Sequence, residues 1–283
     1  MTFGAHIYLW MDGWSDAALP LLGSARALGL DCLEIAWGDE VEFDLAATRR
    51  EAQRVGIGLI LSPGGVWPME CDLSLPDPDA RALARAWHRR AVDVAAEIGA
   101  GAYTGAIYGH PGRVERRGPT GDELTRCAEE LNSLAQYAAD RGVRVVLEPM
   151  SHFRTHLLHT PAQLSRLLDL ADHPNLAGLL DTYHMVTEVR DYAAGVRQVG
   201  RRLWGIHACE NDRGVPGGGL VPWGPLAEGL AEVGFDGYVG LESYNSGPGG
   251  LARRRGLFND PCPDGDVFVT QGLAFLRDLL GAA

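Results

Sequence analysis

Eight short apolar runs alternate with segments of helical character along the whole of this 283-residue chain. The first run is HIYLW at 6–10 and the last is YVGLE at 238–242. Near-continuous apolar strands separated by helices are typical of a parallel sheet whose faces are covered by helices. No GxGxxG motif follows the first run, so the fingerprint of a dinucleotide-binding open sheet is missing. Eight repeats therefore predict an α/β fold, a single-domain (β/α)8 TIM barrel.

The expected strands and helices follow one another in a regular order. We expect strands at 6–10, 31–37, 57–62, 102–108, 143–148, 176–181, 203–208 and 238–242. Helical patterns lie near 15–28, 43–55, 77–98 and 121–141, and a further helix begins after Thr160-Pro161, where a capping residue precedes proline. No linker divides the chain, so residues 1–283 are expected to form one domain. Long loops near 108–120 and 243–266 would rise from the active-site face.

Four acidic or imidazole side chains each close one of the later apolar runs: Glu148, Asp181, His207 and Glu242. The gaps between them are 33, 26 and 35 residues, each about one strand-plus-helix unit. The carboxyl ends of barrel strands meet at one mouth, where buried carboxylates would repel one another without a cation. Carboxylates together with an imidazole suit a divalent metal. The set predicts a metal site, although one such residue alone is more often a helix cap, or a core histidine in the case of His207.

The charge balance and the cysteines exclude several classes of protein. With 25 basic and 37 acidic residues the net charge is −12, which disfavours binding to the phosphate backbone of a nucleic acid. The five cysteines are scattered without a CxxC pair, which argues against a disulfide framework and a thiolate zinc site. The amino terminus lacks a leader pattern, and no stretch reaches the roughly 18 apolar residues of a membrane span. We therefore expect a soluble cytoplasmic protein without nucleic-acid or membrane partners.

Further polar residues are expected near the metal site. His184, in the segment DTYHM, would hydrogen-bond a substrate oxygen or support a metal ligand from behind. Arg213, in HACENDRGVPGGG, would orient an anion or a polarised oxygen, unless it is a solvated loop residue. His6 and His110 could reach the same mouth. For the arginine cluster 253–255, phosphate binding, a subunit contact and simple solvation all stay open, with solvation as the default.

Four segments carry a resemblance to a known family: LEPMSHFRTHLLHT, LLDTYHM, HACENDRGVPGGGLVPW and FDGYVGLESY. Together they resemble the xylose-isomerase-like TIM-barrel superfamily of sugar phosphate isomerases and epimerases. Within it they are most similar to ketose 3-epimerases of the tagatose and psicose (allulose) type. The matching segments lie within 145–245, whereas the first half of the chain matches in architecture only. The four signatures are specific in combination and weak separately.

The resemblance implies a divalent-metal-dependent sugar isomerase or epimerase. One Mn²⁺ ion, or Mg²⁺ or Co²⁺ in its place, would be held by Glu148, Asp181, His207 and Glu242. The ion would act as a Lewis acid and stabilise a cis-enediolate of the sugar. Glu148 would remove the proton beside the carbonyl, and Glu242 would return one on the opposite face. The resemblance also implies a homodimer or homotetramer.

The same resemblance assigns substrate contacts, and one position departs from it. His184 and Arg213 fall on positions that contact substrate oxygens in the family. Where ketose 3-epimerases carry another glutamate after the first metal glutamate, this chain has Arg154, in EPMSHFRTHL. A guanidinium reverses the charge offered to the substrate and would suit a carboxylate or phosphate group. We therefore expect a carbohydrate, sugar-acid or sugar-phosphate substrate, while the alternative that Arg154 turns away and pairs with a surface acid stays open.

Other functions stay open at this point. Dehydratases of the inosose or dehydroshikimate type in the same superfamily also form an enolate, so the motifs separate them poorly from epimerases. A non-catalytic barrel subunit would keep the fold, but it would not need two glutamates placed for proton transfer. A relative of the apurinic endonucleases is disfavoured, because that class needs a multi-zinc cluster with more histidines and a basic groove.

Overall fold

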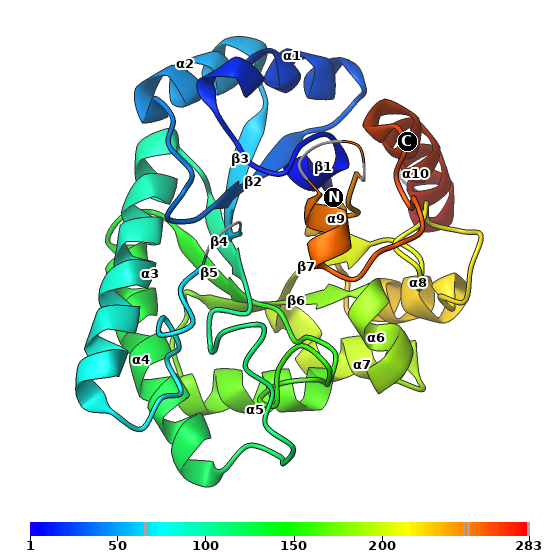
Figure 1. Cartoon of the computed structure of the whole chain (residues 1–283). Coiled ribbons are helices and arrows are strands. Elements are labelled where there is room, and N and C mark those ends of the chain that lie inside the picture. Colours follow the sequence, from blue (N-terminus) through cyan, green and yellow to red (C-terminus); the bar gives the residue numbers. More distant parts are fainter. Residues whose placement is uncertain (65–66, 246, 248–249, 282–283) are drawn as a thin grey trace.

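Eight parallel strands close into a barrel in sequence order (Figure 1). The computed structural model describes residues 1–64, 67–245, 247 and 250–281, so positions 246, 248 and 249 of the predicted loop at 243–266 lie outside the described residues. Each strand pairs in parallel with the next, and β8 pairs with β1 to close the sheet. The predicted (β/α)8 barrel is confirmed. Its strands are β1 (Thr2–His6), β2 (Cys32–Trp37), β3 (Gly58–Pro63), β4 (Ala102–Gly105), β5 (Arg144–Leu147), β6 (Leu176–Asp181), β7 (Leu203–Ala208) and β8 (Tyr238–Leu241).

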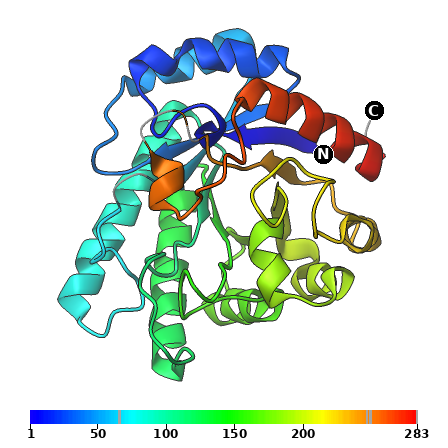
Figure 2. The same cartoon turned by 45° about the vertical axis from the view of Figure 1, so that its right-hand side comes forward.

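Helices surround the barrel (Figures 1 and 2). In the described residues, no helix combines the length and the apolar character that crossing a membrane requires. The short helix α9 differs from the others, because it lies across one mouth of the barrel rather than along its outer wall (Figure 2). The α-helices are α1 (Pro20–Ala27), α2 (Leu45–Val55), α3 (Pro78–Ile98), α4 (Gly121–Ala139), α5 (Pro161–Ala171), α6 (Thr182–Glu188), α7 (Tyr192–Val199), α8 (Trp223–Glu232), α9 (Leu251–Arg254) and α10 (Gly265–Leu280).

Helix α5 begins where the sequence predicts it. The hydroxyl of Thr160 accepts a hydrogen bond from the N–H of Gln163 at 3.3 Å, and the Gln163 side chain accepts one from the N–H of Thr160 at 3.0 Å. This reciprocal capping box satisfies N–H groups that the first turn of a helix leaves unpaired. Pro161 occupies the first helical position, where its missing N–H costs nothing. The start of α5 is therefore fixed by local sequence.

Two expected strands differ from the observed ones. The prediction of a strand at 6–10 is wrong, because β1 is Thr2–His6. Ile7–Leu9 form a 3-10 turn, which begins with a hydrogen bond from the N–H of Tyr8 to the His6 ring. The segment at 2–6 forms the strand because it pairs with β2 on one side and β8 on the other. The strand expected at 102–108 ends at Gly105, whose φ of +117° turns the chain out of the sheet.

A second layer of buried side chains lies behind the carboxyl ends of the strands. Alternate residues of a strand point to the same side of the sheet, so Val146 shares a side with Glu148, and Leu179 shares one with Asp181. Val146 and Leu179 belong to a compact buried cluster. It consists of Cys32, Ile60, Ala102, Val146, Ala177, Leu179 and Tyr238. The layer gives the residues at the strand ends a packed support.

Tyr238 occupies space that glycines on the neighbouring strands leave open. A Cβ atom on Gly4 would lie 2.7 Å from Tyr238 Cε2, and one on Gly205 would lie 3.0 Å from Tyr238 Cδ1. The ring is therefore buried inside the barrel, at 3% exposure, and its hydroxyl reaches Glu34 Oε2 at 3.3 Å. Because protein interiors are close-packed, a methyl group at either glycine would displace the ring.

We predict that Gly4→Ala lowers the free energy of unfolding by about 1–3 kcal/mol, the usual effect of overpacking a core. The added methyl group would meet Cys32 Sγ at 2.6 Å and the Cys32 carbonyl oxygen at 2.9 Å. Gly101→Ala is the control, because its Cβ would meet nothing within 4 Å. Urea unfolding followed by circular dichroism measures both variants, and an unchanged midpoint for Gly4→Ala would contradict this account of the barrel interior.

Candidate metal centre

The four residues that close the later strands converge at one mouth of the barrel. Glu148 directly follows β5, Asp181 ends β6, His207 lies on β7 and Glu242 directly follows β8. One ligand atom from each lies within 4.8 Å of the others, and all four residues are buried. The register explains the convergence, since β6 and β7 align Asp181 with His207. The structure therefore brings together the four residues that the sequence predicts as metal ligands.

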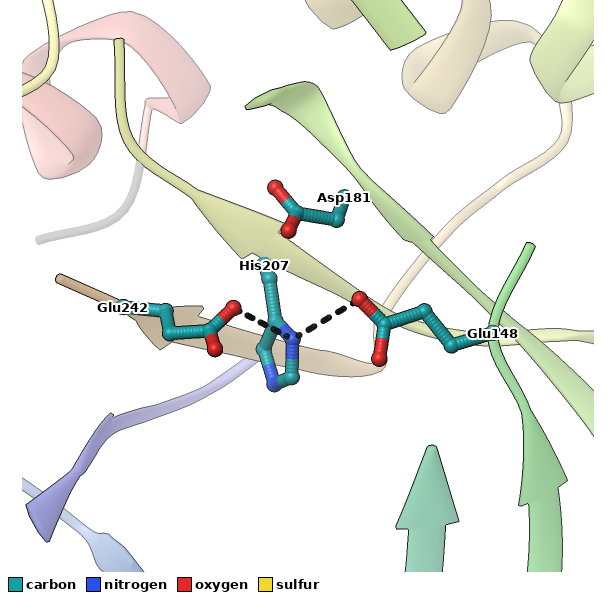
Figure 3. Close-up of side chains that lie close together, drawn as sticks. All are labelled: Glu148, Asp181, His207 and Glu242. Carbon is teal, nitrogen blue, oxygen red and sulfur yellow. Dashed lines mark ion pairs between the residues drawn. The ribbon is translucent and has the colours of Figure 1, made fainter. Parts of the chain in front are cut away.

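The two glutamates approach the histidine from opposite sides (Figure 3). Nδ1 of His207 lies 3.6 Å from Glu148 Oε1 and 3.3 Å from Glu242 Oε2. Asp181 lies to one side of this line, with its carboxylate near the imidazole ring (Figure 3). Three carboxylates and one imidazole nitrogen thus face a common point.

Two of the atoms that face this point form no hydrogen bond among the described residues. Oδ2 of Asp181 and Nδ1 of His207 are buried and take part in no hydrogen bond among the described residues. The other oxygen of Asp181 accepts a hydrogen bond from the N–H of Tyr183 at 2.8 Å. Arg213 Nη2 lies 2.9 Å from Asp181 Oδ2, but His207 Nδ1 has only carboxylate oxygens beside it. Because buried polar atoms are almost always satisfied, this group of atoms could bind a cation. Oxygen ligands and one imidazole fit a divalent ion of the Mg²⁺, Mn²⁺ or Co²⁺ kind.

A second group of potential ligands shows the contrast. Glu115, Glu123 and His156 also bring ligand atoms close together. Here Arg117 already donates to both oxygens of Glu123, at 2.7 and 2.8 Å, and the same carboxylate accepts a hydrogen bond from the N–H of Thr120 at 2.8 Å. A guanidinium already neutralises this group, so it needs no metal.

Glu34 completes the cluster and was not predicted from the sequence. Its Oε2 accepts a hydrogen bond from Nε2 of His207 at 3.0 Å, and its Oε1 accepts one from the hydroxyl of Thr104 at 2.9 Å. This bond places an imidazole proton on Nε2, so Nδ1 is the nitrogen left to bind a metal at the cluster. A signal was available in the sequence, because Glu34 is a charged residue inside the apolar run DCLEIAW.

Burial and neighbouring charges act against each other on these groups. Burial raises the pKa of Glu148 and of Asp181 above their ordinary values. Burial also opposes ionisation of Glu242, but Arg213 and His207 outweigh it and hold the pKa of this carboxyl well below its usual range. Arg213 and His207 thus favour the ionised form of Glu242, whereas Glu148 and Asp181 would need a further positive charge, such as a bound cation, to favour theirs.

Arg213 reaches the cluster from the loop after β7. Its Nη1 donates to Glu242 Oε2 at 2.8 Å, and its Nη2 lies 2.9 Å from Asp181 Oδ2. The guanidinium stacks over the ring of Tyr183 at 4.2 Å from the centroid, and the residue is 3% exposed. Its φ of +66° is rare for a residue other than glycine, and such strain is common at functional sites. The sequence prediction placed Arg213 at this mouth, and the structure finds it there.

His184 lies in the first turns of α6, also beside the cluster. Its Nδ1 accepts a hydrogen bond from the N–H of Ser151 at 3.2 Å and lies 2.6 Å from the Ser151 hydroxyl. Burial, reinforced by Arg213, lowers the pKa of His184 well below its ordinary value. The ring is therefore neutral and carries its proton on Nε2, which lies 3.7 Å from Asp181 Oδ2. A neutral donor thus lies beside the cluster.

A cavity of about 420 Å³ opens over the cluster. Arg154 lines its wall, as do His6 and His110, which the sequence suggested could reach the mouth. Arg254 and Arg255 of the arginine cluster 253–255 line it as well, whereas the sequence alone favours a solvated cluster.

The comparisons with known proteins agree with this arrangement. The family model described as xylose isomerase-like TIM barrel matches residues 22–276. The chain belongs to this family. An L-ribulose 3-epimerase of Methylomonas sp. (strain DH-1) is 31% identical over 249 residues, which cover 87% of this chain and 85% of the relative. A ketose 3-epimerase of Arthrobacter globiformis is 28% identical, with 100% of this chain and 98% of the relative covered.

A solved structure extends the likeness to three dimensions. The crystal structure of a D-allulose 3-epimerase from Methylomonas sp. superposes with a TM-score of 0.92 at 28% identity, over 99% of this chain and 98% of that one. The xylose isomerase-like barrel of this chain therefore has the same overall architecture as a ketose 3-epimerase, strands and helices included. Four sequence segments indicated a resemblance to this family, and the comparisons confirm it.

We predict that Glu34→Gln weakens Mn²⁺ binding about 10- to 100-fold, the usual effect of losing a hydrogen bond that orients a metal-binding histidine. An amide no longer attracts the Nε2 proton of His207 as a carboxylate does, so the ring loses its fixed tautomer. Calorimetric titration of Mn²⁺ into chelator-treated protein measures the affinity. Glu51→Gln, a change at an exposed surface ion pair with Arg54, is the control. Equal affinity in folded Glu34→Gln protein would remove Glu34 from this role.

Proposed function

We propose that this protein is a divalent-metal-dependent epimerase that inverts the carbon next to the carbonyl of a ketose, as a ketose 3-epimerase does. The observation that carries the proposal is the placement of Glu148 and Glu242 on opposite sides of His207 Nδ1, at 3.6 and 3.3 Å. Two carboxylates on opposite sides of a bound sugar can exchange protons with both of its faces. The relatives named 3-epimerases support the same reaction.

The metal would be held by Glu148, Asp181, His207 and Glu242, and Mn²⁺ is the ion that we propose. When bound, such an ion supplies a fixed positive charge that stabilises negative charge developing on a substrate oxygen. Oδ2 of Asp181 and Nδ1 of His207, which form no hydrogen bond among the described residues, support this assignment.

The protein side chains would carry the proton transfers. The carboxylate of Glu148 takes the proton from the carbon beside the carbonyl. The electron pair of that C–H bond forms a carbon–carbon double bond, and the carbonyl π pair moves onto its oxygen to give the enediolate. Glu242, which must hold a proton when the reaction runs in this direction, gives it to the same carbon from the opposite face as the carbonyl re-forms. The configuration is inverted, Glu148 is left protonated and Glu242 is left ionised. In the reverse direction the two glutamates exchange roles.

Two neighbours would position the substrate and the carboxylates. His184 would donate from Nε2 to a substrate oxygen, because Ser151 occupies its Nδ1. Arg213 would hold the carboxylates of Glu242 and Asp181 in place. The contact of its guanidinium with the ring of Tyr183 restricts the movement of the Arg213 side chain. Hydrogen-bond donors fixed before the substrate binds lose little energy in reorganisation. A cytoplasmic location and a homodimer or homotetramer stay predictions.

Proton exchange with solvent tests the proposed reaction. We expect Mn²⁺-loaded protein in D2O to place deuterium at C3 of at least one ketose or ketose derivative, as followed by NMR. Deuterium at C1 or C2 would instead indicate aldose–ketose isomerisation and contradict the proposal. Loss of water from a cyclic substrate without exchange into a ketose would favour the dehydratase alternative.

Glu148→Gln and Glu242→Gln should each lower the exchange rate about 100- to 10,000-fold, because each removes a group that transfers a proton. Metal content is measured for each variant, since both residues are also proposed ligands. Glu130→Gln, which changes a carboxylate paired with Arg85 on the outer helices, is the control. Full activity in either metal-loaded glutamine variant would exclude that glutamate from proton transfer.

A further inference from the structure

Two arginines line the cavity above the candidate metal centre, and neither has an acidic partner among the described residues. Arg154 lies in the loop after β5, and Arg255 directly follows α9. In the part of the chain that the structure describes, neither guanidinium takes part in an ion pair or a hydrogen bond. The other arginines of the cavity differ, because Arg213 binds Glu242 and Arg254 lies 3.8 Å from Asp12 Oδ2. Two positive charges on the cavity wall are thus left for a ligand.

The positions of both residues are fixed by the backbone. The N–H of Arg154 donates to the Ser151 carbonyl at 2.8 Å, and the Arg154 carbonyl accepts from the N–H of Gly112, also at 2.8 Å. The N–H of Arg255 donates to the Leu251 carbonyl at 3.0 Å, which anchors it to the helix across the barrel mouth (Figure 2). Both residues are half-buried. The side chains therefore start from fixed points on the cavity wall.

The two charges act on one another. Burial, and next to it the positive charge of Arg255, lower the pKa of Arg154 below its ordinary value. Half-buried like charges without a counter-ion destabilise a protein, and an anion placed between them removes this penalty. Burial opposes the charge of Arg255 too, but Tyr244, Tyr8 and Glu242 outweigh it and raise the pKa of this residue. A neutral ketose offers hydroxyl groups only and would leave the charge of Arg154 without a counter-ion.

An anionic oxygen-rich group fits this pair. A guanidinium binds carboxylate and phosphate oxygens through two parallel hydrogen bonds. A phosphate monoester carries a charge of about −1.5 to −2 near neutral pH, which two arginines balance. The candidate metal centre lies at the strand ends, whereas Arg255 lies at the helix across the mouth. A sugar with its reacting carbons at the metal centre would present its other end to the arginines.

We propose that the substrate of this site carries an anionic group, a phosphate monoester or a carboxylate, and that Arg154 and Arg255 bind it. The inference rests on the proposed epimerase function, because it assigns the substrate class of the same site. An enzyme with this anion site would prefer a charged substrate over a free ketose.

Paired substrates test the inference in the Mn²⁺-loaded protein. We compare D-fructose with D-fructose 6-phosphate and with 5-keto-D-gluconate, and expect kcat/KM at least about tenfold higher for an anionic compound. The phosphate and the keto acid distinguish the two kinds of anion. Arg154→Gln and Arg255→Gln should raise KM for the preferred anion about 10- to 100-fold, a larger factor than the change in KM for D-fructose, which carries no anionic group. Arg253→Gln removes the same charge from an exposed position of α9 outside the cavity and should change neither.

Calorimetric binding of D-fructose and D-fructose 6-phosphate separates this inference from the proposed reaction. Tighter binding of an anion that is lost in both arginine variants, without proton exchange in any sugar, would support the anion site and contradict the epimerase. Proton exchange in neutral ketoses, with the arginine variants equal to Arg253→Gln, would support the epimerase and overturn the anion site. Neither binding nor exchange would overturn both.

Discussion

Three carboxylates and an imidazole buried within 4.8 Å of one another are the constraint on which the rest of this structure depends. Such a group is stable only when a positive charge lies among its members. Arg213 supplies part of that charge through Glu242 and Asp181, and a divalent ion would supply the remainder. The surrounding structure serves the same group, since Glu34 orients His207 and Tyr238 supports Glu34 from inside the barrel. The arrangement of the residues around the cluster and the proposed chemistry thus follow from one electrostatic requirement.

The sequence predicts the barrel well, because a repeating strand-and-helix pattern with apolar strands has few other solutions. It predicts strand ends less well where apolar residues continue past the sheet. The residues at 7–9 are as apolar as a strand, yet they form a 3-10 turn, because the partner strands β2 and β8 pair with 2–6. Pairing between strands far apart in the chain decides such boundaries, and no local pattern reports it.

The candidate site likewise has residues that the sequence predicts and residues that it does not. Glu148, Asp181, His207 and Glu242 were predictable, because all strands of a parallel barrel direct their carboxyl ends to one mouth. Glu34 was not predicted, although a carboxylate within an apolar strand indicates a buried partner. The partner, His207, is 173 residues away in sequence, so no local pattern identifies it. Arg255 could not be placed either, because the path of the loop after β8 decides whether it enters the cavity or solvent.

Anomalous X-ray diffraction at the manganese absorption edge, from crystals of Mn²⁺-loaded protein, tests the central claim most directly. The account predicts one anomalous peak per chain, between the carboxylates of Glu148, Asp181 and Glu242 and Nδ1 of His207. A peak elsewhere, for example beside Glu115, Glu123 and His156, would contradict it. So would the absence of a peak at this mouth in protein exposed to excess Mn²⁺, because the buried carboxylates would then be stabilised without a metal.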